Sequence, residues 1–67
     1  MTKKDYEAIA HALYCEQQVA NDAQWSTEHK VVHGNAVFML AQRIADIMER
    51  DNPRFDRGRF MRACGFD

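Results

Sequence analysis

The stretch DNPRFDRGRFMRACGF, residues 51–66, decides the fold because it ends one helix and begins another. Proline lacks an amide hydrogen and pushes the residue before it away from helical geometry. Pro53 therefore predicts that a preceding helix ends at about residue 51, with Asn52 as its terminator. Beyond this point we expect the chain to turn back on itself.

The residues after the turn predict a short third helix over 57–64. Asp56 is its expected N-cap, because an aspartate oxygen can accept an amide hydrogen bond from the first helical turn. Phe55 and Phe60 then occupy the two positions of a hydrophobic staple, which fixes the angle at which the chain enters the helix.

The end of this third helix is also signalled locally. Gly65 predicts a left-handed residue after the last turn, a conformation that strains any residue with a side chain. Phe66 is then expected to fold back on Met61 or Phe60.

Upstream, residues 3–21 predict a first helix. Thr2 and Asp5 have the spacing of a capping box, and an acid suits the positive end of the helix dipole. At 100° per residue, the apolar side chains of this segment cover about half of the helix circumference, which is wider than the usual apolar stripe.

Glu16 falls near the middle of that apolar arc, where a carboxylate needs a partner. Two interpretations are open. Glu16 either reaches solvent or pairs with an arginine or histidine across the core, or it takes part in a subunit contact. It is therefore a candidate interface residue.

A polar turn, NDAQWST at residues 21–27, separates the first helix from a second over 27–51, so the two form a hairpin. Ser26 or Thr27 can cap the second helix. Gly34 weakens it, because glycine costs about 1 kcal/mol relative to alanine inside a helix. We expect one continuous helix, with a start at Asn35 as the alternative.

Composition places the chain among cytoplasmic proteins. The longest apolar run, AVFMLA at residues 36–41, has six residues, whereas a membrane span needs about 20. The chain has two cysteines, Cys15 and Cys64, which do not form a CxxC motif. Its first residues lack the apolar core of a signal peptide. We therefore expect a soluble protein in a reducing environment.

Net charge limits the classes of partner. The chain carries −1 overall, but residues 54–67 hold four arginines against two aspartates. An acidic chain has no general attraction for nucleic acid or anionic lipid. The basic C-terminal segment is therefore the place where an anionic partner could bind.

The chain is short for a stable monomer. At 67 residues, it buries roughly 60% of the surface that its unfolded form exposes. Two helices with such wide apolar arcs have more surface to bury than they can cover for each other. We predict an all-α single domain over residues 1–67 that forms a homodimer resembling a four-helix bundle, with the short helices closing its ends.

Both ends of the chain resemble a known family. The start TKKDYEAIA and the tail NPRFDRGRFMRACG are similar to short phage- and prophage-encoded proteins of uncharacterised function, whose tail has the pattern NPRFDRxRFxxACG. The resemblance covers about a third of the chain. It implies an accessory protein that binds a bacterial host protein, such as an inhibitor of a host process or defence system, and it supplies no catalytic residue.

Arg54, Arg57, Arg59 and Arg62 are the candidate partner-binding residues. Two of them stand in the first turn of the predicted third helix, where a positive charge opposes the helix dipole at a cost of about 0.3–1 kcal/mol. Either nearby acids offset this charge or an external anion does, on an acidic protein surface or on nucleic acid. The nearby acids are Asp46, Glu49, Asp51 and Asp56.

Four side chains are candidate zinc ligands. His11 and Cys15 are four residues apart, as are His29 and His33, so each pair shares a helix face. In a hairpin that turns near residue 22, the two pairs would lie level. No CxxC or HExxH motif accompanies them, so we favour neither a metal nor another cofactor.

Catalysis has little support, since Cys15 with His11 is the nearest approach to a nucleophile and its base. We expect a non-enzymatic protein that docks an apolar patch, rimmed by Arg54, Arg59 and Arg62, against a bacterial protein. One alternative is a nucleic-acid-binding accessory protein that uses the same arginines. Another is a small domain stapled by zinc.

Overall fold

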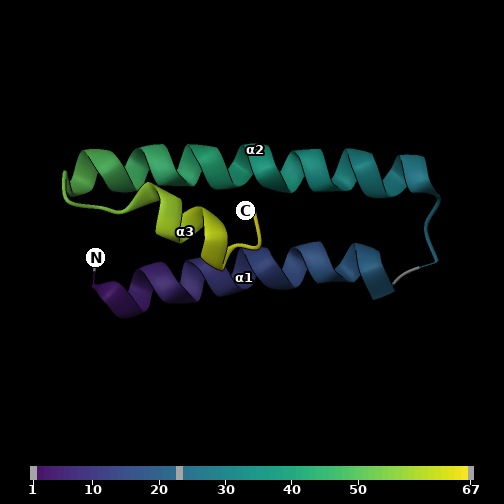
Figure 1. Ribbon diagram of the computed structural model, residues 1–67, viewed down its shortest axis with the longest axis horizontal. Helices are drawn as coiled ribbons and strands as arrows, with labels where there is room; N and C mark the ends of the chain where they lie inside the picture. The colour runs from purple at the N-terminus through teal and green to yellow at the C-terminus, as the bar shows by residue number, and fades with distance from the viewer. Residues whose placement is uncertain (1, 23, 67) are drawn as a thin grey trace.

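The structure, a computed structural model, describes residues 2–22 and 24–66 and shows three helices and no strand in these segments. They are α1 (Lys3–Asp22), α2 (Thr27–Asp51) and α3 (Arg57–Ala63). α1 and α2 run antiparallel, and α3 turns back over them from the end of α2 (Figure 1). The predicted all-α architecture is confirmed, with α1 ending one residue later and α3 one residue earlier than expected.

Side-chain caps begin the two long helices. The Thr2 amide donates to Asp5 Oδ2 over 2.9 Å and the Asp5 amide donates to Thr2 Oγ1 over 3.3 Å, so the predicted capping box is confirmed. The backbone hydrogen bond from Thr2, followed by its side-chain bond, holds the pKa of Asp5 below its ordinary value of 3.8. Ser26 caps α2, because its Oγ accepts the His29 amide over 3.1 Å.

α2 runs without a break through Gly34, so the alternative start at Asn35 is wrong. A Cβ built on Gly34 would meet no atom within 4 Å, which shows that packing does not require glycine there. Burial of one side of α2 against the rest of the protein outweighs the low helix propensity of a single glycine. The buried residues of α2 are Val37, Ala41, Ala45 and Met48.

The 52–56 connection reverses the chain where Pro53 predicts it. Asn52 has left helical geometry, with φ −143° and ψ 105°, although its amide still donates to the Met48 carbonyl over 2.9 Å. The Asn52 carbonyl then accepts the Phe55 amide over 2.9 Å, which closes the turn. The proline therefore ends α2 and directs the chain back toward α1.

The start of α3 follows the local signals. Asp56 Oδ1 accepts the Arg59 amide over 3.0 Å, so Asp56 is the N-cap as predicted. The ring centroids of Phe55 and Phe60 lie 5.6 Å apart, which confirms the hydrophobic staple.

The end of α3 is a Schellman motif. Gly65 has a φ of 95°, and the amides of Gly65 and Phe66 donate to the carbonyls of Arg62 and Met61, each over 2.9 Å. The backbone of Phe66 thus folds back on Met61, as expected. Its ring packs edge-on against Phe38 of α2, with 5.0 Å between centroids, a tertiary contact that the local pattern does not contain.

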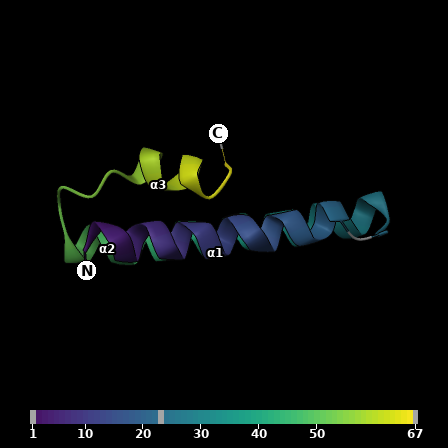
Figure 2. The ribbon, with the colours of Figure 1, turned by 90° about the horizontal axis from the view of Figure 1, so that it is seen from below.

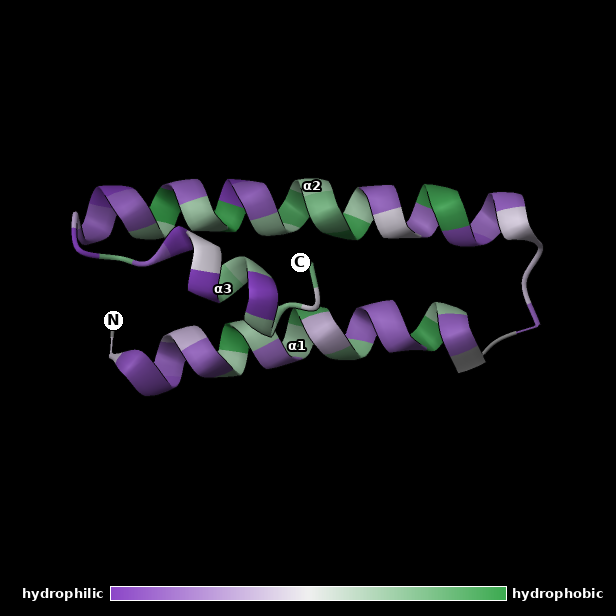
Figure 3. Cartoon of the chain, viewed as in Figure 1, coloured by the Kyte–Doolittle hydropathy of each residue, from purple (hydrophilic) through white to green (hydrophobic). Residues whose placement is uncertain are grey.

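One hydrophobic core lies where the three helices meet. Hydrophobic residues recur in bands along α1 and α2, with hydrophilic residues between them (Figure 3). Ala41, Ala45 and Met48 of α2 have no exposed surface, and the small alanines allow close approach of the neighbouring helices. Phe60 and Cys64 complete the core from the C-terminal segment.

The hairpin has two different faces. α3 lies entirely on one of them, and the described chain places nothing on the other (Figure 2). We call the first the covered face. We call the second the bare face, and it is formed by Ala12, Leu13 and Glu16 of α1 with His33, Ala36, Val37 and Leu40 of α2.

Candidate functional site

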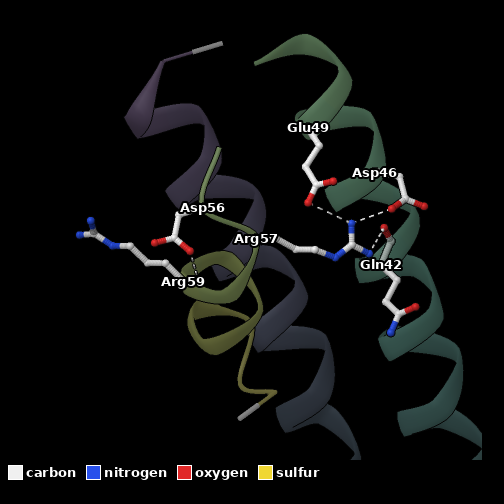
Figure 4. A network of polar contacts seen from close by, with 6 residues as sticks. All are labelled: Gln42, Asp46, Glu49, Asp56, Arg57 and Arg59. Carbon is white, nitrogen blue, oxygen red and sulfur yellow. Dashed lines mark hydrogen bonds and ion pairs between the residues drawn. The ribbon is translucent and has the colours of Figure 1, made fainter. Parts of the chain in front are cut away.

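The four candidate arginines have different surroundings, and Arg57 is bound within the protein. Its side chain crosses from α3 to α2 (Figure 4). Nη1 lies 2.6 Å from Asp46 Oδ1 and 3.5 Å from Glu49 Oε1, and Nη2 donates to the Gln42 carbonyl over 3.3 Å. Two of the acids expected to offset the arginine charge therefore do so for Arg57.

These contacts stabilise a cation at an unfavourable place on the α3 dipole. The hydrogen bond with Asp46 is the main cause that raises the pKa of Arg57 above its ordinary value. The Arg57 side chain is 34% exposed, so water and salt weaken each ion pair. We infer that the contacts chiefly fix the position of α3 on α2.

Arg54, Arg59 and Arg62 keep their guanidinium groups free within the described part of the chain. The backbone amides of Arg54 and Arg59 are bonded to Asn52 Oδ1 and Asp56 Oδ1, but neither side chain makes an ion pair there. Arg59 leaves α3 on the side away from Arg57 (Figure 4). Three cations on the covered side thus remain able to meet an external anion.

The bare face carries a shallow groove of about 470 Å³ between α1 and α2. Glu16 is the acidic residue among those that line it. Leu40 in the groove is 51% exposed, and Ile47, seven residues further along the same side of α2, is 56% exposed. Apolar side chains of this size, aligned along one helix, form a surface typical of a helix-packing interface.

Glu16 pairs with a histidine, as one interpretation of the sequence expected. Its Oε1 lies 3.7 Å from His33 Nε2, and the same nitrogen donates to the Glu16 carbonyl oxygen over 2.9 Å. The ring of Trp25 packs edge-on against His33, with 5.1 Å between centroids. The Glu16 side chain remains 57% exposed, so its carboxylate is also accessible to a second chain.

The candidate zinc ligands do not come together. His33 lies beside Glu16 and is not level with His11. The turn lies after Asp22 and before Thr27, so its centre comes later in the chain than the predicted position near residue 22. His29 instead stacks on Trp25, with 4.1 Å between ring centroids. Residues 2–22 and 24–66 contain no group of three or more His, Cys, Asp or Glu side chains placed to hold a metal ion. The expected level arrangement is wrong.

The two cysteines have different environments, and both are free thiols. Cys15 Sγ lies 3.4 Å from His11 Nε2 on the exposed side of α1, where no other described side chain orients the imidazole. Cys64 is buried, and burial raises the pKa of its thiol, which favours the neutral form and suits a core position.

No helix in the described part of the chain has both the length and the hydropathy to cross a membrane. Comparisons with protein-family models, curated proteins and solved structures find no match. The features that remain to explain are three free arginines on the covered side and an apolar groove on the bare face.

Proposed function

We propose that this protein is a non-enzymatic interaction protein that acts as a homodimer and binds an acidic surface of a bacterial host protein. The observation that supports it most strongly is the one-sided fold, in which α3 covers one face and leaves the apolar groove of the other face open. The resemblance of the chain ends to phage- and prophage-encoded proteins favours a host protein as the partner, including a component of a defence system.

The bare face is large enough for a dimer interface. The molecule extends 39 by 18 Å in the plane of the hairpin, a projected area of about 700 Å², which lies within the range of about 600–1,000 Å² that each partner contributes to a standard interface. Packing two bare faces together gives a four-helix bundle, made of two antiparallel hairpins with a shared apolar interior. Since α3 lies over the covered face, the short helices would flank this bundle rather than close its ends.

The covered side would stay free in such a dimer. Each copy then presents Arg54, Arg59 and Arg62 to solvent on an outer surface. Guanidinium groups bind carboxylates through two parallel hydrogen bonds, so an acidic protein surface is a suitable partner. Two copies of the arginine set also allow bivalent binding to a repeated or dimeric target.

Light scattering after size-exclusion chromatography tests the dimer. We expect wild type at twice the 7.8 kDa of one chain. Leu40→Asp should give a folded monomer, because it places a charge in the groove of the bare face. Val31→Asp is the matched control, since Val31 is 54% exposed but lies on the side of α2 that carries Phe38. A folded wild-type monomer at micromolar concentration would disprove the dimer.

A pull-down from bacterial lysate tests the arginines. The triple alanine variant of Arg54, Arg59 and Arg62 should lose the host protein that wild type recovers. A control with the same change in net charge replaces Lys4, Lys30 and Arg50 by alanine, and it should retain that protein. Recovery of the same proteins by wild type and the arginine variant would exclude a recognition role for these residues.

Nucleic acid is the second candidate partner, favoured by the same cluster of free arginines. Three phosphate contacts predict that affinity for duplex DNA falls about 40-fold as salt rises fourfold. We expect instead that the protein does not bind a duplex oligonucleotide at about 150 mM salt. Specific, steeply salt-dependent binding that disappears in the triple alanine variant would replace the host-protein proposal with this one.

A further inference from the structure

A cleft of about 410 Å³ lies between α1 and α3 on the covered side of the hairpin. Residues from the start of α1, the 52–56 connection and α3 line it, so opposite ends of the chain meet there. Its volume falls in the range of about 300–1,000 Å³ that is usual for ligand pockets. The cleft is thus large enough for one or two side chains of a bound peptide.

The floor of this cleft is aromatic. Tyr6 of α1 packs against Phe55 with 5.1 Å between ring centroids, and Phe55 packs against Phe60 at 5.6 Å. Ala63 lies beside them on α3, and its small side chain leaves the space above the rings open. An apolar side chain entering the cleft would bury its surface against these rings.

The rim of the cleft carries more positive than negative charge. Lys3, Arg54 and Arg59 line it, and none of the three side chains forms an ion pair within the described chain. Of the two acids that also line it, Asp56 already accepts the Arg59 amide over 3.0 Å as the helix cap. Glu7 is the other acid. The available charge on the rim therefore favours an anionic ligand.

We propose that this cleft binds an acidic peptide segment of the partner protein, with one large apolar side chain on the aromatic floor and flanking carboxylates on Lys3, Arg54 and Arg59. The inference rests on the proposed function, because it names the chemistry that the arginine side recognises. A duplex nucleic acid fits this cleft less well, because its bases stay stacked inside the duplex and cannot enter the cleft to contact the aromatic floor.

Fluorescence anisotropy with a defined probe tests the cleft. The probe is a fluorescein-labelled nine-residue peptide that has one phenylalanine flanked on each side by four aspartates. Replacing its phenylalanine by alanine, or its aspartates by asparagine, should weaken binding about tenfold or more, since each change removes one half of the recognition. These peptide variants leave the protein unchanged, so a folding defect does not affect the result.

Protein variants then locate the binding. Ala63→Phe should fill the cleft and weaken binding about tenfold, while Arg54→Ala with Arg59→Ala should do so by removing charge. Glu7→Gln should tighten binding about threefold, because it removes a repulsive carboxylate. The matched control, Lys4→Ala with Arg50→Ala, changes two exposed cations away from the cleft and should leave binding unchanged.

Three results of the peptide-binding measurements would overturn the inference. These are no binding of the probe at millimolar protein, equal binding of the phenylalanine and alanine peptides, or full binding by Ala63→Phe with normal helical circular dichroism. If the cleft inference fails, the dimer measurement and the pull-down with the triple alanine variant keep their meaning. Failure of the proposed function would therefore be detected separately. Preferential binding of an unlabelled duplex oligonucleotide in competition would also contradict it.

Discussion

The two faces of the hairpin both carry apolar residues, but these residues are buried on one face and exposed on the other. On the covered face, Phe60 of α3 is 4% exposed and Cys64 has no exposed surface. On the bare face, Leu40 and Ile47 keep about half of their surface in water. The difference follows from the length of the C-terminal segment, because one seven-residue helix can cover one face only. The proposed dimer would cover the other face.

Substitution of one residue from each face should give the largest contrast. Phe60→Ala removes a buried ring and should lower the free energy of unfolding by about 3–5 kcal/mol, which is enough to unfold most of a domain this small. Leu40→Ala should cost less than about 1 kcal/mol in a dilute monomer. Urea unfolding followed by circular dichroism measures both.

Protein concentration sharpens this comparison. The effect of Phe60→Ala should not depend on concentration, because the lost contacts lie within one chain. The effect of Leu40→Ala should grow as concentration rises, because association stabilises the folded form by mass action. Identical concentration dependence for the two variants would contradict the assignment of Leu40 to a subunit interface.

Replacing a glycine by alanine should have opposite effects on stability at the end of α3 and inside α2. Gly65→Ala should lower the free energy of unfolding by about 1–2 kcal/mol, because alanine is strained at a φ of 95°. Its Cβ would also lie 2.8 Å from Gln17 Nε2, which donates a hydrogen bond to the Cys64 carbonyl. Thermal unfolding tests this, and an unchanged melting temperature would show that the Schellman turn does not hold α3 in place.

Gly34→Ala should have the opposite sign. The helix already passes through this position and an added Cβ meets no atom within 4 Å, so stability should rise by about 0.4–1 kcal/mol. The same thermal measurement applies. A fall in melting temperature would mean that another chain packs closely on Gly34, which would extend the interface along α2.

Tyr6 offers a smaller test on the covered side. Its hydroxyl is buried and has no hydrogen-bond partner among the described residues, although its ring packs against Phe55. Tyr6→Phe keeps the ring and removes the unsatisfied group, so stability should stay the same or rise by less than about 1 kcal/mol. Clear destabilisation in urea would show that the hydroxyl has a partner in solution.

The smallest expected effect is the pH dependence of the α1 cap. Because the pKa of Asp5 is lowered in the folded state, its cap contributes fully above its ordinary pKa of 3.8 and is lost as pH falls through the lower folded value. The melting temperatures of wild type and Asp5→Asn should therefore converge below about pH 4. A constant difference from pH 7 to pH 2 would argue against an ionised cap.

Much of the backbone could be predicted from neighbouring residues. Capping side chains at Ser26 and Asp56, the break at Pro53 and the left-handed Gly65 each act within a few positions, so their effects are visible in the sequence. The preferred prediction of one continuous helix through Gly34 is also confirmed. The ring of Phe66 could not be placed, because its contact with Phe38 depends on how α3 lies on α2.

The arginines show the same limit at the candidate site. All four stand in one short segment and look alike in sequence, yet Arg57 meets Asp46 and Glu49 while Arg59 projects from the other side of α3. Lys3 and Tyr6 gave no sign that they would share a cleft with Arg54, since they come from the other end of the chain. The spacing of the histidines made a zinc site one alternative. The position of the turn instead places His33 beside Glu16.

By itself, the sequence determined the helices, their caps and the point of chain reversal, because these depend on hydrogen bonds and backbone strain between near neighbours. Tertiary structure alone decided which half of each apolar arc is buried, which arginine is paired and where the cleft opens. Those outcomes depend on the direction in which α3 leaves Pro53 and on the register of α1 against α2, and both are set by packing of side chains that are distant in the chain.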